Sequence, residues 1–148
     1  MSVWDDYVGQ KVAGYDDFST PVSNKRFNKP NCTWYCWNRA SYQAGKQLVF
    51  NPNASANAFE WLDAVDTSNC TVVRGKLIPV RNSIVVYSGG SKGLGHVLYV
   101  EQVLDGKVYF TEANFNEAQN GIYQVTPTST FTTWRSPNHT MLGYIKLL

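Results

Sequence analysis

The chain is poor in cysteine, has little excess charge of either sign and lacks any long apolar run. Its 148 residues include three cysteines, 13 basic residues and 11 acidic residues, for a net charge of +2. Three thiols form at most one internal disulfide, which excludes a disulfide scaffold and favours a reducing compartment or a reserved reactive thiol. A net charge this small argues against nucleic-acid binding, which needs a clustered basic face.

Signals for a membrane or for secretion are also missing from the sequence. No segment approaches the ~18 apolar residues that a membrane span requires. Residues 1–6 have neither the basic start nor the apolar stretch of a signal peptide. We therefore expect no membrane partner. The composition, 43% hydrophobic and 16% charged, is that of a globular protein. We expect residues 1–148 to form a single domain, with residues 1–30 as an N-terminal segment.

Helix signals lie in the first half of the chain. We expect a short helix over residues 4–12 and a longer one from Cys32 to about residue 44. Asn31 is a plausible N-cap for the longer helix, and Gly45 stands where helices commonly stop. A third helix is predicted over residues 54–66, where apolar residues recur at three- and four-residue steps: Ala58, Phe59, Leu62 and Val65.

Strand signals fill the second half of the chain. Asp105-Gly106 predicts a hairpin, because this dipeptide readily adopts the positive-φ turn. The fold class expected is α+β, with N-terminal helices packed on an antiparallel sheet. The predicted strands are rich in Val, Ile and Tyr and cover residues 71–73, 83–87, 96–103, 107–112, 121–125 and 142–147.

Cys32 is the candidate nucleophile, because it lies in the first turn of the predicted helix. Unpaired N–H groups and the helix dipole stabilise a thiolate there. His96, at the start of a predicted strand, is the candidate base, and Glu112 and Asn114 are candidates to orient its ring. Each residue also has an ordinary structural interpretation: a lone cysteine is more often a small core residue, and a lone histidine is more often structural or merely exposed. Cys36 is interpreted as packing.

The glycine-rich segment 89–95 contains two misleading motifs. Gly89 to Gly93 matches the G-x-S-x-G serine motif as a string, but a strand follows where that motif needs a helix. No Gly-Lys-Ser/Thr is present for a phosphate loop. We interpret the segment as a flexible rim loop beside His96. The second histidine, His139, lies in a Pro-Asn-His loop without a partner motif and is set aside.

Taken together, these residues resemble the CHAP family, the cysteine, histidine-dependent amidohydrolases/peptidases. The similarity runs from about residue 30 to the C-terminus. Asn82 stands where the family commonly has glycine, and asparagine tolerates the left-handed conformation. The resemblance is carried by Cys32-Thr33-Trp34-Tyr35 with Asn38-Arg39-Ala40, by Gly95-His96-Val97 with Tyr99-Val100-Glu101, and by Glu112-Ala113-Asn114.

The resemblance implies a papain-like α+β domain that cleaves an amide of bacterial peptidoglycan through Cys32, as a monomer without a cofactor. Asn31 stands where the family often has Gln and is assigned to the oxyanion or substrate site. Trp34 and Trp37 are candidates to line a groove for glycan or stem peptide, although core packing explains them equally well. Some relatives carry an Asp-rich calcium loop near the nucleophile. Residues 24–31 contain no acidic residue, so we expect no metal site.

Several alternatives stay open. The bond cleaved is either the muramoyl–alanine amide or a stem or cross-bridge peptide bond. The chain is otherwise a papain-like hydrolase of another amide, or a non-catalytic wall-binding or phage structural module. The expected location is the host cytoplasm before release to the wall, for a phage lysin, or within a larger phage or secreted protein.

Overall fold

The computed structural model describes residue 27 and residues 31–115, 119–125 and 137–148. For residue 42 and for residues 113–115 and 119–125 it describes the backbone alone. The helix predicted over residues 4–12 and the acid-free segment 24–31 fall wholly or mostly outside these ranges.

Helix α1, Cys32–Ala44, has the predicted bounds. Asn31 occupies the N-cap position with extended backbone, but its side chain makes no capping hydrogen bond. Gly45 ends the helix in the left-handed conformation, with φ 67°. The Lys46 amide then donates to the Ala40 carbonyl at 3.1 Å, which satisfies a carbonyl that the helix end leaves open. The cysteine therefore begins a regular helix.

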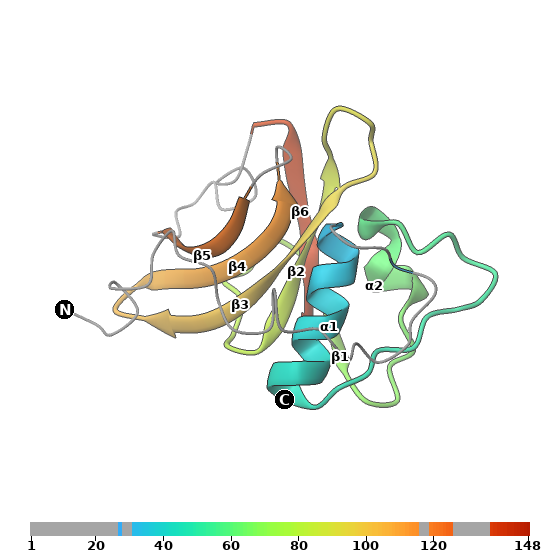
Figure 1. Cartoon of the computed structure of the whole chain (residues 1–148), viewed down its shortest axis with the longest axis horizontal. Helices are drawn as coiled ribbons and strands as arrows, with labels where there is room; N and C mark the ends of the chain where they lie inside the picture. The colour runs from blue at the N-terminus through green and yellow to red at the C-terminus, as the bar shows by residue number, and fades with distance from the viewer. Residues whose placement is uncertain (1–26, 28–30, 116–118, 126–136) are drawn as a thin grey trace.

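A six-stranded antiparallel sheet follows, in the order β1-β6-β2-β3-β4-β5. All six strands predicted from the sequence are present, most of them one to three residues longer than expected. Figure 1 shows α1 lying beside the middle of the sheet. The strands are β1 Thr71–Arg74, β2 Ser83–Gly89, β3 His96–Leu104, β4 Lys107–Phe115, β5 Gln119–Val125 and β6 His139–Lys146.

Two left-handed turns confirm sequence predictions. Asp105 and Gly106 have φ of 52° and 74° and join β3 to β4 as a two-residue hairpin. Asn82 has φ 56° and precedes β2. Its side-chain oxygen accepts a hydrogen bond from the Tyr99 hydroxyl at 2.9 Å, so asparagine both tolerates the turn and anchors it to β3.

The helix predicted over residues 54–66 is wrong in extent. The structure has a single 3₁₀ turn, Ala58–Glu60, and then α2, Trp61–Ala64. Ala56 has φ 56°, which a continuous helix does not allow. At the other end, Val65 is extended and pairs with Phe50. Tertiary strand pairing therefore overrides the helical periodicity at this end of the segment.

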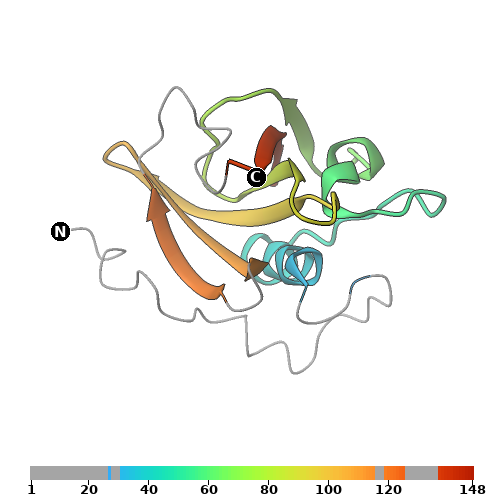
Figure 2. The ribbon, with the colours of Figure 1, turned by 90° about the horizontal axis from the view of Figure 1, so that it is seen from above.

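The sheet is buried on both faces because strand residues alternate between two apolar clusters. Ile84 and Val86 join the cluster that includes α1, whereas Val85 and Tyr87 join a cluster on the other side of the sheet. Figure 2 shows α1 end-on beside β3 and β4. The helix start is thereby held near the beginning of β3 and the end of β4.

Candidate active site

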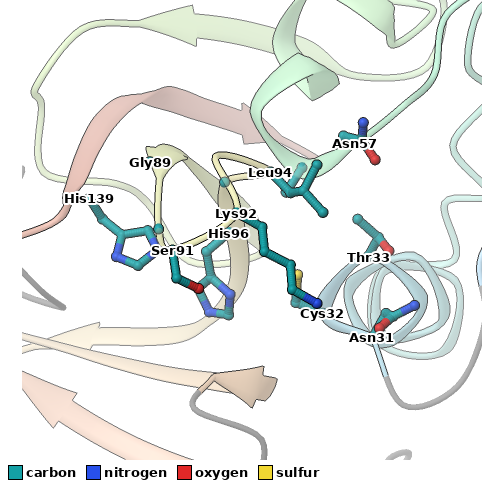
Figure 3. A pocket seen from close by; sticks show the side chains of 13 residues that line it. Asn31, Cys32, Thr33, Asn57, Gly89, Ser91, Lys92, Leu94, His96 and His139 are labelled. Carbon is teal, nitrogen blue, oxygen red and sulfur yellow. The ribbon is translucent and has the colours of Figure 1, made fainter.

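A cleft of about 310 Å³ opens where α1, the glycine-rich loop and two strands meet. Cys32 is partly exposed in it, at the first position of α1. Figure 3 shows the Cys32 sulfur on one side of the cleft and the His96 ring beside it. The lining residues are Asn31, Cys32, Thr33, Asn57, Ala58, Gly89, Gly90, Ser91, Lys92, Leu94, Gly95, His96 and His139.

His96 is held from behind by Glu112. The imidazole Nε2 lies 2.8 Å from the Glu112 carboxylate, and the two residues are 3% and 0% exposed. His96 begins β3, and Glu112 lies near the end of the neighbouring β4. Because Glu112 engages Nε2, we assign Nδ1 to the hydrogen bond with Cys32. The carboxylate therefore fixes both the orientation and the tautomer of the ring.

The site favours a thiolate–imidazolium pair. Burial alone raises the pKa of Cys32, but the charge of His96 and its hydrogen bond, with backbone hydrogen bonds from Val97 and Thr33, bring that pKa below its ordinary value. Burial alone lowers the pKa of His96. Cys32 and Glu112 outweigh it and raise the His96 pKa to about 9. His96 therefore holds its proton at neutral pH, and the lowered Cys32 pKa enlarges the fraction of thiolate, which is the nucleophilic form of a thiol.

Cys36 lies one turn further along α1 and has the opposite environment. It is fully buried, and burial raises the pKa of its thiol well above the ordinary value. Nearby Cys32 and the two carboxylates of Glu112 and Glu101 raise that pKa further. Cys36 is thus a core residue, as the sequence analysis expected. All three cysteines, including Cys70, are free thiols.

Asn31 and Asn114 were also expected at the site. Asn31 is exposed and lines the cleft beside Cys32. Asn114 lies in β4, two residues beyond Glu112, but its side chain is outside the described part. The β4–β5 register shifts between Glu112 and Phe115, so simple strand alternation does not determine which way Asn114 faces. Its orienting role stays a prediction.

Trp34 and Trp37 do not line the cleft, which corrects the groove expected from the sequence. They are 7% and 4% exposed and belong to the core cluster around α1. The Trp37 indole N–H donates to the Leu48 carbonyl at 2.8 Å. Burial of most of α1 on all sides is the physical reason, since every residue from 34 to 40 is buried.

His139 is the site residue that the sequence analysis missed. It begins β6, lines the cleft, and has its ring centroid 6.2 Å from that of His96. The prediction placed this part of the chain in a loop, because strand signals begin only at residue 142. No local motif signals this position, because it depends on the pairing of β6 with β2, in which Gly89 faces His139.

The glycines beside His96 allow close backbone packing. The interpretation of this segment as a flexible loop did not include this reason for having glycine there. A Cβ on Gly89 would lie 2.1 Å from the Asn138 carbonyl oxygen. A Cβ on Gly95 would lie 2.3 Å from the Tyr87 carbonyl oxygen and 2.7 Å from the Phe59 amide nitrogen. These separations are shorter than van der Waals contact, so only glycine lets the segment pass between β6 and the 3₁₀ turn.

The described ranges contain neither a cluster of metal-ligating side chains nor a membrane-spanning helix. No group of three or more His, Cys, Asp or Glu side chains in them is placed to hold a metal ion. No helix of that part of the chain is long and apolar enough to cross a membrane.

The fold and the site define a papain-like α+β domain with a cysteine at a helix start and a histidine on an adjacent strand. The family model of the CHAP domain matches residues 22–114, more than half of the chain. The chain therefore belongs to the CHAP domain family. A comparison with curated protein sequences found no match.

Solved structures with the same fold include two crystal structures of Ly7917. One is described as Ly7917 with the hydrolyzing product of MDP, with a TM-score of 0.59 and 16% identity. The other, of Ly7917, has a TM-score of 0.54 and 14% identity. Each covers 79% of this chain, and this chain spans 53% of theirs, about half of their length. At this identity the likeness establishes the fold.

The pH dependence of the His96–Glu112 pair gives a prediction for Glu112→Gln. Any reaction that needs the proton on His96 should slow as pH rises through about 9, where His96 loses it. The variant removes a carboxylate that raises the His96 pKa, so the alkaline limb should move to lower pH. Turnover should slow by on the order of 10²-fold. Rate profiles against pH measure both effects. An alkaline limb that stays unchanged in the variant would contradict the role of Glu112 in raising the His96 pKa.

Proposed function

We propose that this chain is a cysteine hydrolase that cleaves an amide bond of bacterial peptidoglycan. The observation that carries the proposal is the arrangement of Cys32 and His96 on an open cleft, with Glu112 buried behind the imidazole. In this arrangement the thiol pKa is lowered and the imidazole pKa is raised. Membership of the CHAP domain family supports the same chemistry. A purely structural cysteine would not need a partner that lowers the pKa of its thiol.

The first half of the reaction forms an acyl-enzyme. The Cys32 sulfur attacks the amide carbonyl, and a carbon–sulfur bond forms as the carbonyl oxygen becomes an oxyanion. N–H groups at the start of α1 have no acceptor within the helix, since the first helical bond runs from the Tyr35 amide to the Asn31 carbonyl. The Cys32 amide, with the Asn31 side chain, is our candidate for the oxyanion hole. His96 then protonates the leaving nitrogen as the carbon–nitrogen bond breaks.

The second half regenerates the thiolate. Neutral His96 takes a proton from water, the hydroxide adds to the thioester carbonyl, and the carbon–sulfur bond breaks to release the Cys32 thiolate and a carboxylic acid, which gives its proton to solvent. Glu112 stabilises the imidazolium at the start of the cycle and again after deacylation. His96 donates a proton in the first half and accepts one in the second, so its ring must stay in a fixed orientation throughout.

Digestion of purified Gram-positive and Gram-negative peptidoglycan, with mass spectrometry of the released fragments, tests this function. New amino termini on alanine paired with free muramic carboxyl groups would identify a muramoyl–alanine amidase. New termini within the stem or the cross-bridge would identify an endopeptidase. No fragments from either wall type, with folded protein, would contradict the proposal and point to another amide substrate or a binding role.

A further inference from the structure

His139 forms the wall of the cleft on the side of His96 away from the nucleophile. Its ring packs edge-on against the rings of His96 and Tyr87. The ring centroids are 6.2 Å and 6.4 Å apart, and the interplanar angles are 68° and 86°. Figure 3 shows His139 and Ser91 on one side of His96 and Cys32 on the other. The cleft thus has two ends, one at Cys32 and one at His139, with His96 between them.

The backbone fixes the position of this wall. His139 pairs with Gly89 across β2 and β6, and the Gly90 amide donates to the Asn138 carbonyl at 3.1 Å. A Cβ on Gly90 would lie 3.1 Å from the His139 Nε2, tighter than ordinary contact. The glycine therefore gives the imidazole room at the cleft wall.

The direction of the reaction assigns a role to each end of the cleft. The acyl carbon must reach the Cys32 sulfur, and the leaving nitrogen must reach the proton on His96. A substrate placed in this way sends its leaving segment past His96. The first groups that this segment meets are His139 and Ser91.

The charge of the cleft selects the chemistry of that segment. None of the residues that line the cleft is Asp or Glu, whereas Lys92 and two histidines are among them. Lys92 is exposed, and no ion pair joins it to another residue of the described ranges. An imidazole N–H and a serine hydroxyl are hydrogen-bond donors that suit a carboxylate. Figure 3 shows the Lys92 amine reaching toward the Cys32 side of the cleft, so the polar groups at the other end are those of His139 and Ser91. That end is complementary to an anion.

We propose that His139, with Ser91, forms the leaving-group subsite and selects amides whose leaving segment carries a free carboxylate within its first two residues. The proposal rests on the proposed function for the direction of the substrate. It adds to that function a specificity-determining residue outside the set of Cys32, His96 and Glu112. The proposed substrate class is therefore an amide whose leaving amine belongs to a short peptide segment with a free carboxylate.

Binding of a leaving fragment to Cys32→Ala tests the proposal without any turnover. The probes are alanyl-alanine, which has a free carboxylate, and its C-terminal amide, which differs only in that group. The chain contains two histidines, so imidazole NMR signals are assigned by comparison with one additional variant, His139→Phe. The His139 signals should shift saturably, and the carboxylate probe should bind about tenfold more tightly than the amide.

Matched variants in the same background separate the role of His139 from general damage. His139→Phe keeps a ring against Tyr87 and His96 but removes the donor, so the tenfold preference should disappear. His139→Gln retains a donor and should restore part of it. Thr140→Val, at the exposed neighbouring position, should leave the preference unchanged. Dissociation constants for all variants come from the backbone amide signals of residues 90–95.

The proposal would be overturned by equal affinity for the two probes, by binding of neither, or by a preference that survives in His139→Phe. None of these results depends on hydrolysis. Failure of the intact protein to release wall fragments would instead contradict the proposed function. The two failures are therefore distinguishable.

Discussion

Cys32→Ala should abolish hydrolysis and leave the fold intact. The loss should be on the order of 10⁶-fold, as expected when a nucleophile that acts as part of a unit is removed. Cys32 is partly exposed at the first position of α1, so removal of its sulfur leaves little cavity. The free energy of unfolding should change by less than about 1 kcal/mol. Release of labelled fragments from purified walls and urea denaturation measure the two quantities.

The control for this prediction is the neighbouring thiol. Cys36→Ala removes a sulfur that is fully buried, and it should lower stability by about 1–2 kcal/mol through the cavity it leaves. Its rate per folded molecule should stay close to that of the intact protein. If Cys36→Ala were folded and inactive while Cys32→Ala remained active, the assignment of the nucleophile would be wrong.

Arg39→Leu should give the largest loss of stability, because it breaks a buried ion pair. Arg39 Nε and Nη2 each donate to a Glu101 carboxylate oxygen at 2.8 Å, and the residues are 6% and 3% exposed. Thr111 donates to the same carboxylate at 2.7 Å. The network ties α1 to β3 and β4, the elements that carry the three site residues. Removing the arginine strands a buried charge, and the free energy of unfolding should fall by about 3–5 kcal/mol.

Two further variants make the measurement specific. Arg39→Leu combined with Glu101→Leu removes both charges and should recover most of the lost stability. Arg74→Leu breaks the exposed pair with Asp63, whose side chains are 59% and 78% exposed, and should cost at most about 1 kcal/mol. Urea denaturation of the variants gives the values. A loss for Arg39→Leu no larger than that for Arg74→Leu would contradict a structural role for the buried pair.

Much of the fold follows from local sequence signals. The bounds of α1 follow from Asn31 and Gly45, and the β3–β4 hairpin follows from Asp105-Gly106. The strands follow from β-branched and aromatic runs. Such signals act over a few residues, so a single sequence contains them. The segment 54–66 differs because its end is set by the pairing of Val65 with Phe50, a tertiary contact that helical periodicity does not contain.

The site was predictable to the extent that strand order brings residues together. The hairpin that Asp105-Gly106 predicts joins β3 to β4, and these adjacent strands place His96 beside Glu112. His139 belongs to the last strand, β6, which lies between β1 and β2 in the sheet, and no local motif reveals that crossover. Trp34 and Trp37 failed as groove residues for a related reason. Burial of α1 on nearly all sides depends on the packing of distant segments.

Alkylation of Cys32 by iodoacetamide as a function of pH tests the central claim most directly, because it reports the thiolate without needing a substrate. A Cys36→Ala/Cys70→Ala variant leaves one thiol, so intact-mass measurements follow Cys32 alone. We predict fast alkylation in the folded protein with a midpoint below the ordinary thiol pKa of 9.0. His96→Ala should move that midpoint upward. A midpoint near 9.0 that stays the same in His96→Ala would contradict an activated Cys32.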